Sequence, residues 1–287
     1  MMAGKKVSLV LGGGGARGYA HIGVIEELEK RGFEIISISG SSMGALIGGL
    51  FACGKLDEYK KWVQELDAMD VFSLVDFTLQ SGGLIAGDKV FEKIAKMIGD
   101  HTFESLPIKL TAVATDIVRE REVWFQSGDL LQALRASIAI PFVFTPVKIE
   151  DMILADGGIL NPLPVAPTMS DISDLTIAVN LYADIPKPKI VISKKEEEQR
   201  NAFSQAFEEM ANLFYKKENN LTMFDILDKT FDTMQDGLTR YRLGGYPPDL
   251  LIEISKDVCS TYDFHKAQEV IEVGKLTARQ QLDAKGF

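Results

Sequence analysis

Two glycine-containing turns hold residues whose types and spacing could perform acyl transfer. Gly12–Gly18 reads GGGGARG, and Gly40–Gly44 reads GSSMG. The first turn offers backbone N–H donors with almost no side chain to block them. The second is a Gly-x-Ser-x-Gly turn that can hold the hydroxyl of Ser42 in a sharp bend. Each turn follows a short apolar run and opens a helical pattern, so a nucleophile and an oxyanion hole would meet at the carboxyl edge of one sheet.

The glycine loop also fits a second pattern, because Gly13, Gly15 and Gly18 have the spacing of a dinucleotide-binding fingerprint. That interpretation needs an acidic residue at the end of the following strand, whereas Glu34 stands at the start of that strand. No P-loop sequence with its lysine is present either. We therefore interpret the loop as an anion-binding turn at a helix N-terminus, which serves an oxyanion as well as a phosphate.

Ser42 is the predicted nucleophile because it is the central residue of the second turn. Gly40 and Gly44 would relieve clashes around such a strained turn, and the helix N-terminus that follows would stabilise developing negative charge. The neighbouring Ser41 is the weaker candidate. The alternative is a tight strand-to-helix turn with a capping serine.

A serine nucleophile needs a base, and Asp156 is the candidate carboxylate. It closes the apolar run Met152–Ala155 and precedes Gly157 and Gly158, which permit close backbone approach. An ordinary aspartate has a pKa of about 3.9 and is a weak base at neutral pH, but partial desolvation would raise that pKa. From these residues alone, a turn aspartate is an equally good interpretation.

Histidine is the usual base, and the order Ser42, Asp156, His265 is the triad order of the α/β-hydrolases. In that fold, however, the nucleophile follows several strands, and His265 begins what reads as a surface helix. His21 is expected to form a local hydrogen bond near the glycine loop, and His101 is expected to lie in a loop.

Composition narrows the function class. The chain has 287 residues, a net charge of -10 and no Lys/Arg-rich tract, so a nucleic-acid partner is not expected. Cys53 and Cys259 are predicted to be reduced thiols of a cytoplasmic protein, and three scattered histidines predict no metal site. Residues 35–54 lack charges, but their serines and glycines divide them into strand, turn and helix rather than a membrane span. Val7–Leu11 is too short for the core of a signal peptide.

Apolar β-rich runs alternate with helical patterns in the first part of the chain. We predict strands at 6–11 and 34–39, an amphipathic helix at 18–31 and a second helix at 43–53. This alternation is typical of an α/β fold with a mostly parallel sheet covered on both faces. Further elements are predicted as strands at 108–115, 122–126, 147–149, 152–154 and 175–180, and as helices at 88–98 and 130–138.

The last third departs from this alternation. Residues 185–200 combine prolines with a charged run and are predicted to be a connector, and residues 201–243 have a helical pattern. A final strand and helix are predicted within 250–282. A strand so late in the chain predicts a return to the same sheet. We therefore predict a single domain over 1–287 with a helical excursion, and with the chemistry-bearing motifs inside 6–180.

Two apolar stretches have two interpretations each. Aromatic and methionine residues recur at helical spacing in the C-terminal region, and we predict that they are core rather than a membrane-facing surface: Phe203, Phe207, Met210, Phe214, Ile226, Phe231, Met234, Leu238 and Tyr241. Residues 71–87 fit neither period. They are predicted to be a long loop packed on the core, and the alternative is a lid or an acyl-chain wall.

With these motifs in their order and spacing, the chain resembles the patatin-like phospholipase family, and its compact bacterial members in particular. Gly13–Gly18 matches the family's glycine-rich oxyanion motif, and Gly40–Gly44 matches its nucleophile motif. Asp156–Gly158 matches its Asp-Gly-Ala/Gly motif, and Ala136–Pro141 is similar to a further Ala-Ser-x3-Pro block. The resemblance covers residues from 6 to about 180.

The resemblance implies a three-layer α/β/α fold with a mostly parallel central sheet and a Ser42–Asp156 catalytic dyad without histidine. By family position, the N–H groups of Gly14 and Gly15, with Arg17, would form the oxyanion hole. The implied reaction is independent of calcium, and no metal or cofactor is expected. Two interpretations of Arg17 stay open: contact with a lipid phosphate, or a structural hydrogen-bond network that fixes the loop.

The same resemblance implies a serine esterase that hydrolyses carboxylic esters of lipids. The expected partners are a lipid ester and, by peripheral contact, the inner face of a membrane. The competing hypotheses are a non-catalytic lipid-binding or regulatory module with the same pocket, and an esterase that never meets a membrane. The sequence carries no signal for head group, acyl-chain length or oligomeric state.

Overall fold

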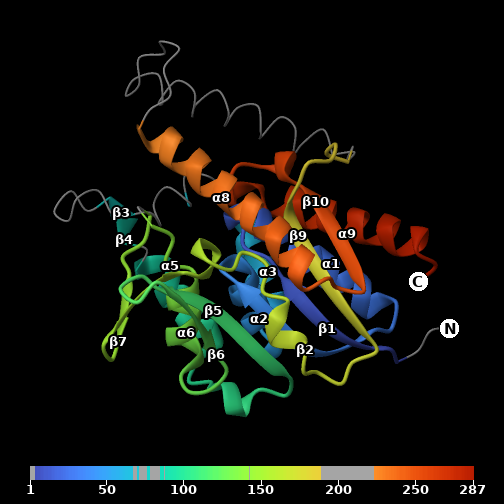
Figure 1. Ribbon diagram of the computed structural model, residues 1–287, viewed down its shortest axis with the longest axis horizontal. Coiled ribbons are helices and arrows are strands. Elements are labelled where there is room, and N and C mark those ends of the chain that lie inside the picture. Colours follow the sequence, from blue (N-terminus) through green and yellow to red (C-terminus); the bar gives the residue numbers. More distant parts are fainter. Residues whose placement is uncertain are drawn as a thin grey trace, which may run out of the picture.

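A central sheet of eight strands organises the chain. The computed structural model describes residues 4–66, 70, 76–77, 85–86, 88–141, 143–188 and 223–287. The strands are ordered β10-β9-β1-β2-β5-β8-β7, and β6 also pairs with β5 (Figure 1). Their bounds are β1 (Lys6–Leu11), β2 (Glu34–Ser41), β5 (Lys109–Asp116), β6 (Arg121–Phe125), β7 (Val147–Ile149), β8 (Met152–Asp156), β9 (Leu175–Ala183) and β10 (Leu250–Ser255).

The strand directions confirm the expected mostly parallel sheet. Strands β10, β9, β1, β2 and β5 run parallel to one another, whereas β6 and β8 pair antiparallel with β5, and β7 pairs antiparallel with β8. The antiparallel strands lie at 121–125, 147–149 and 152–156, close to the ranges predicted from the sequence. A separate antiparallel pair, β3 (Asp76–Phe77) with β4 (Ile85–Ala86), lies within 71–87. Most of that stretch falls outside the described residues, so both of its interpretations stay predictions.

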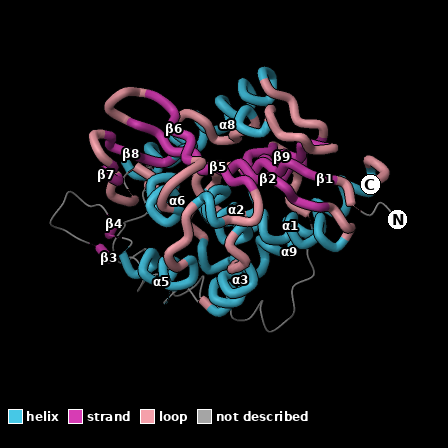
Figure 2. The backbone as a smooth tube through the Cα atoms, turned by 90° about the horizontal axis from the view of Figure 1, so that it is seen from below, coloured by secondary structure: helices cyan, strands magenta, loops and turns pink. Residues whose placement is uncertain are grey.

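Helices cover both faces of the sheet, as the α/β/α expectation requires. Figure 2 shows α1, α2, α3 and α9 on one side of the sheet and α8 on the other. The helix bounds are α1 (Ala20–Lys30), α2 (Met43–Ala52), α3 (Leu56–Glu65), α5 (Asp88–Ile98), α6 (Leu130–Ser137), α8 (Met223–Gly245) and α9 (Ala267–Ala284). The sequence analysis missed α3. Residues 35–54 form β2 and α2, and within the described part of the chain no helix combines the length and apolar content needed to cross a membrane.

Alternation along the strands divides the core between the two faces. Leu9 and Leu11 of β1 belong to the large apolar cluster beneath α1, α2 and α9. Val10 faces the other way and joins a small cluster with Ala178 and Leu163, against which Leu243 of α8 packs. Each fully buried leucine or valine contributes about 1.5–3 kcal/mol, so the large cluster carries most of the apolar stabilisation.

Helices α1 and α9 approach each other at two glycines. A Cβ on Gly23 would lie 2.0 Å from the carbonyl oxygen of Ile271, and a Cβ on Gly274 would lie 2.1 Å from that of Ala20. Because backbone atoms occupy both places, no larger residue fits without moving a helix. The two glycines therefore allow the close crossing of α1 and α9.

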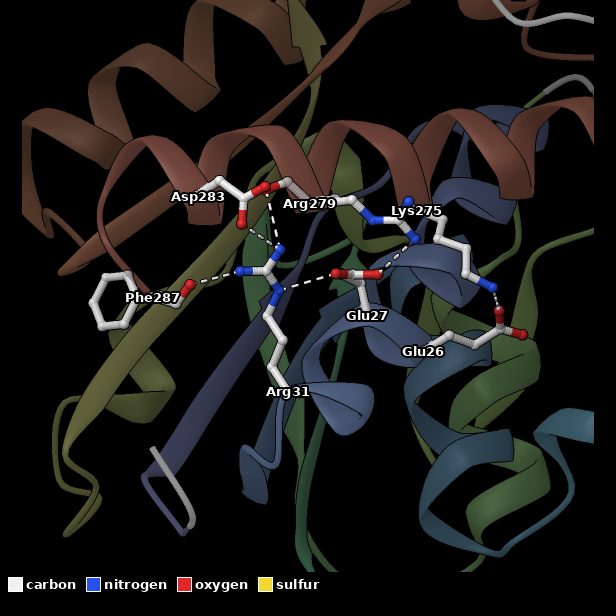
Figure 3. Close-up of polar contacts among 7 residues, drawn as sticks. All are labelled: Glu26, Glu27, Arg31, Lys275, Arg279, Asp283 and Phe287. Atoms are coloured by element: carbon white, nitrogen blue, oxygen red, sulfur yellow. Dashed lines mark hydrogen bonds and ion pairs between the residues drawn. The ribbon is translucent and has the colours of Figure 1, made fainter. Parts of the chain in front are cut away.

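Ion pairs also join α1 and α9, as Figure 3 shows. The buried carboxylate of Glu27 lies 2.9 Å from Nε of Arg31 and 3.3 Å from a guanidinium nitrogen of Arg279. Arg31 reaches on to Asp283 and to the carbonyl oxygen of Phe287. Burial opposes ionisation of Glu27, but the hydrogen bonds and charges of the two arginines outweigh it and hold the pKa of Glu27 below its usual value.

The C-terminal part returns to the sheet. Strand β10 pairs parallel with β9, as predicted for a late strand. That residues 1–287 form one domain stays a prediction. Of the predicted connector at 185–200, the structure describes only the first residues, and 201–222, with Phe203 to Phe214, lie outside the described residues.

The core prediction was wrong for three residues of α8. Ile226, Met234 and Tyr241 of α8 are 45%, 49% and 82% exposed. The reason is that α8 turns a polar stripe toward the sheet, on which Gln235 and Thr239 are buried. Helical periodicity was correct for this segment, but the apolar side of the helix is not the buried side.

Candidate active site

Ser42 occupies a strained turn between β2 and α2. Its φ of 54° and ψ of −127° lie in a region that residues with a side chain rarely adopt. A Cβ on Gly40 would lie 2.5 Å from the amide nitrogen of Ala45, and a Cβ on Gly44 would lie 2.1 Å from the carbonyl oxygen of Leu11. Both motif glycines are therefore required by backbone contact around the turn, as the elbow interpretation predicted.

The structure brings Ser42 and Asp156 together. Ser42 Oγ donates a hydrogen bond of 2.5 Å to Asp156 Oδ2, and the N–H of Gly158 donates one of 2.7 Å to Asp156 Oδ1. Strand β5 lies between the two residues, with Val113 opposite Ser41 on one side and Ala114 opposite Asp156 on the other. Asp156 is fully buried and Ser42 is 3% exposed.

Residues of the Ala136–Pro141 block hold this pair in place. The Ser137 hydroxyl accepts a hydrogen bond of 2.9 Å from the N–H of Ser42 and donates one of 2.6 Å to the carbonyl of Val113. The carbonyl of Ala139 accepts the N–H of Asp156 at 2.9 Å. No role was predicted for this block from the sequence, and its contacts indicate a positioning role.

The surroundings of Asp156 suit a base that works near neutral pH. Burial raises the pKa of Asp156 to about 7, and the hydrogen bonds from Ser42 and from the N–H of Gly158 limit that rise because they stabilise the carboxylate. A Cβ on Gly157 would lie 2.1 Å from the carbonyl oxygen of Val113, so this motif glycine permits the close approach of backbone that the sequence predicted.

The glycine loop lies beside Ser42. A Cβ on Gly13 would lie 3.4 Å from Cβ of Ser42, and the N–H of Gly13 itself donates to the carbonyl of Pro162 at 2.9 Å. Gly15 has a φ of 55°, which favours glycine. The N–H groups of Gly14 and Gly15 have no acceptor within the described residues.

His21 supports the loop from α1. Its side chain is fully buried, and Nε2 donates a hydrogen bond of 2.8 Å to the carbonyl of Gly12. Burial lowers the pKa of His21 to about 4, so the imidazole is neutral at physiological pH. The local hydrogen bond predicted for this histidine is confirmed. Among the described residues, no histidine bonds to Ser42 or Asp156.

Arg17 is enclosed by a hydrogen-bond network and is 4% exposed. Its guanidinium donates to the carbonyl of Gly14 at 3.3 Å, to Asp232 at 2.8 Å and to the hydroxyl of Thr261 at 2.9 Å, and it lies over the Tyr182 ring. Its backbone N–H donates to Gly14 at 3.2 Å. These contacts match the interpretation of Arg17 as part of a structural hydrogen-bond network. Arg17 was predicted to join the oxyanion hole, and its backbone N–H is taken by the carbonyl of Gly14.

Gln235 of α8 is a residue near the site that the sequence analysis missed. It is 3% exposed, and its Oε1 accepts a hydrogen bond from the Tyr182 hydroxyl. A Cβ on Gly158 would lie 2.4 Å from Gln235 Nε2, and a Cβ on Gly13 would lie 3.7 Å from its Oε1. The signal for it was a polar stripe at helical spacing, formed by Asp232, Gln235, Thr239 and Arg242.

Comparison with known proteins agrees with these motifs. The profile of the family described as patatin-like phospholipase matches residues 9–169. The chain belongs to the patatin-like phospholipase family. The uncharacterized NTE family protein Rv1063c of Mycobacterium tuberculosis is 38% identical in an alignment of 331 positions, which covers 97% of this chain and 92% of that protein.

Two longer relatives carry an activity in their names. Lysophospholipase nte1 of Emericella nidulans is 34% identical over 185 residues, which cover 63% of this chain and 12% of that protein. Lysophospholipase NTE1 of Coccidioides immitis is 31% identical in an alignment of 290 positions, which covers 98% of this chain and 18% of that protein. The crystal structure of VipD from Legionella pneumophila aligns with 98% of this chain and 67% of that one at 16% identity and a TM-score of 0.49, a likeness too weak to carry a conclusion.

The remaining candidates of this patatin-like chain lie apart from the dyad contacts. His101 bonds to the Ser105 hydroxyl at 3.1 Å, and His265 lies in the turn before α9. Burial raises the pKa of the Cys259 thiol to about 12, so this cysteine is an unreactive thiol. Across the described ranges, no group of three or more His, Cys, Asp or Glu side chains is arranged to hold a metal ion.

Proposed function

We propose that this patatin-like chain is a serine hydrolase that cleaves carboxylic esters of lipids, of the phospholipase, lysophospholipase or esterase type. The observation that carries the proposal is the 2.5 Å hydrogen bond from Ser42 Oγ to the buried carboxylate of Asp156. Membership of the family supports a lipid ester as substrate. The relatives named as lysophospholipases support the narrower class.

Acylation follows from the positions of the groups. Asp156 accepts the proton of Ser42 while Oγ attacks the ester carbonyl, and the developing oxyanion takes hydrogen bonds from the N–H groups of Gly14 and Gly15. Asp156 then gives its proton to the departing alcohol oxygen. A carboxyl group with a pKa of about 7 can perform both steps near neutral pH.

Deacylation uses the same groups in the reverse order. Water enters where the alcohol has left, Asp156 removes its proton, and the resulting hydroxide equivalent attacks the acyl carbonyl. The oxyanion returns to the N–H groups of the glycine loop. Collapse of this intermediate expels Ser42 Oγ, which recovers its proton from Asp156, and a fatty acid is released.

The proposal is tested with Ser42→Ala and Asp156→Asn on p-nitrophenyl esters of graded chain length and on a lysophospholipid. Loss of the nucleophile or its base is expected to lower kcat by at least about 10³-fold. Ser41→Ala is the matched control, because Ser41 is buried next to Ser42 and its hydroxyl has no partner among the described residues. Turnover like that of the wild type in either dyad variant would reject the dyad, and lipid binding without hydrolysis would favour a non-catalytic module.

The pH dependence gives an independent test. Because Asp156 must be ionised to act as base, kcat/KM is expected to rise about tenfold per pH unit on the acid side and to level off above about pH 7. A profile that is flat between pH 5 and pH 8 would contradict Asp156 as the base.

We extend the proposal to the place of the reaction. Long-chain lipid esters reside in membranes, so the enzyme would meet its substrate by peripheral contact with the cytoplasmic face of a membrane. Co-sedimentation with phospholipid vesicles measures that contact. Equal activity on dispersed short-chain esters and on vesicle lipids, with no protein in the vesicle pellet, would indicate an esterase that works without membrane contact.

A further inference from the structure

Helix α8 brings an uncharged polar side chain to both catalytic turns. A Cβ on Gly158 would lie 2.4 Å from Gln235 Nε2 and 2.9 Å from Asp156 Oδ1, so both atoms lie against the same side of Gly158. On the other side, the position of a Cβ on Gly13 lies 3.4 Å from Cβ of Ser42 and 3.7 Å from Gln235 Oε1. The carboxamide of Gln235 therefore lies between the glycine loop and the Asp156 turn, next to the dyad.

Tyr182 fixes which end of that carboxamide faces the dyad. Burial raises the pKa of Tyr182 far above its usual value, so its hydroxyl stays protonated. This hydroxyl donates a hydrogen bond to Gln235 Oε1. The NH₂ group then points toward Gly158. The carboxylate of Asp156 accepts hydrogen bonds from Ser42 and Gly158 and, within the described residues, not from Gln235.

We propose that Gln235 is a further catalytic residue, whose Nε2–H donates a hydrogen bond to the substrate oxygen that exchanges a proton with Asp156. This inference rests on the proposed hydrolase function. That oxygen belongs to the departing alcohol in acylation and to the attacking water in deacylation. The two occupy the same place, because the carboxyl group that protonates the first deprotonates the second.

The carboxamide contributes without changing its own protonation. In acylation, the bond from Ser42 Oγ to the acyl carbon forms, the ester C–O bond breaks, and the proton moves from Asp156 to the alcohol oxygen. The Nε2–H group stabilises the negative charge that develops on that oxygen before the proton arrives. In deacylation, it holds the water oxygen while Asp156 removes a proton.

Leaving groups of different basicity test this role. An alkyl alcohol needs its proton in order to leave, whereas p-nitrophenolate leaves without one. For Gln235→Met, kcat/KM is expected to fall about 10- to 100-fold on an alkyl ester and less than about threefold on the p-nitrophenyl ester of the same acid. On the p-nitrophenyl ester, kcat falls because deacylation is slowed, and a pre-steady-state burst of p-nitrophenol becomes visible.

Three variants complete the experiment. Thr239→Val is the matched control on the same face of α8: Thr239 is buried, its hydroxyl has no partner in the described part of the chain, and kinetics like those of the wild type are expected. Tyr182→Phe frees the carboxamide and is expected to show part of the alkyl-ester loss. Gln235→Asn withdraws the donor by one methylene, keeps a polar residue, and is expected to show the same leaving-group pattern.

The outcomes separate this inference from the proposed function. Equal losses of kcat/KM on both esters would show that Gln235 only shapes the site and would overturn the inference, as would unchanged kinetics. Thermal unfolding of each variant identifies a loss that comes from misfolding, and Gln235→Asn then decides. If the wild type turns over neither ester, the proposed function fails, whereas a wild type that is active beside uniformly slow Gln235 variants rejects this inference alone.

Discussion

The region between α1 and α9 and the region around Ser42 each bury a carboxylate, but the two carboxylates have opposite environments. Glu27 lies against two arginines, and its pKa is held below its usual value although burial opposes this. Asp156 has one hydroxyl and one backbone N–H, and burial raises its pKa to about 7. We therefore expect loss of the paired charge of Glu27 to destabilise the fold, and we propose the unpaired carboxylate of Asp156 as the base.

The helices over these regions are also held differently. Helix α9 packs on α1 through apolar side chains and two glycines in backbone contact. Helix α8 is held near the site by polar contacts of Asp232 with Arg17, Gln235 with Tyr182, and Arg242 with Glu122. Polar contacts exchange hydrogen bonds to water for hydrogen bonds within the protein, so we expect them to add less net stability than the apolar burial beneath α9. We therefore expect the contact between α1 and α9 to contribute most to stability, and we propose that the region under α8 serves the reaction.

The largest change in stability is expected for Gly274→Ala. The new Cβ would lie 2.1 Å from the carbonyl oxygen of Ala20, so α1 and α9 must separate, and the free energy of unfolding in urea is expected to fall by about 3 kcal/mol. The control is Gly237→Ala in α8, where no atom lies within 4 Å of the new Cβ. There the higher helix propensity of alanine is expected to add up to about 1 kcal/mol. Similar effects of the two substitutions would contradict this expectation.

A smaller effect is expected for Glu27→Gln. Removing the charge leaves two arginines without their buried partner, and stability at pH 7 is expected to fall by about 2 kcal/mol, less than for a fully buried pair because Arg279 is 43% exposed. The native pKa lies below the usual 4.5, so this contribution is present above pH 4.5 and is lost as the pH falls through the native pKa. Urea unfolding at pH 7 and pH 3 measures it, and a deficit that persists at pH 3 would point to packing instead.

The smallest expected effect has the opposite sign, and it belongs to Asp156→Asn. Because the native pKa of Asp156 is raised from 3.8 to about 7, its contribution to stability is full below pH 3.8 and is lost as the pH rises through 7. The variant has no charge to bury and is expected to be more stable than the wild type by about 1 kcal/mol at pH 8, while being inactive. A variant less stable than the wild type at pH 8 would show that the charge of Asp156 does not destabilise the fold.

Local turn chemistry explains how much of the site could be predicted from the sequence. Gly40 is needed by a backbone contact with Ala45 in the same turn, whereas Gly44 and Gly157 are needed by the backbones of Leu11 and Val113 in other strands. The spacing of the motif glycines around Ser42 and Asp156 was nevertheless visible in the chain. The strand and helix alternation was also visible, since apolar periodicity is local. The roles of Ser42 as nucleophile and Asp156 as base remain predictions, which the Ser42→Ala and Asp156→Asn experiments test.

Long-range contacts explain what could not be predicted. Gln235 reaches the dyad only because α8 lies over the sheet face that holds the smaller apolar cluster, and its sequence resembles that of an ordinary amphipathic helix. The exposure of Met234 and Tyr241 has the same origin, because periodicity identifies two sides of a helix without showing which one is buried. The contacts of Ser137 with Ser42 and Val113 were also invisible, since they join three separate segments.

The position of β5 has one more consequence. This strand contributes no reacting side chain, yet Ser41 is paired with Val113 on one of its edges and Asp156 with Ala114 on the other. A slip of one residue in either ladder would send Ser42 or Asp156 to the opposite side of the sheet, and no side-chain substitution could restore their encounter. The proposed reaction therefore requires the correct register of β2 and β8 on β5, in addition to the reacting side chains.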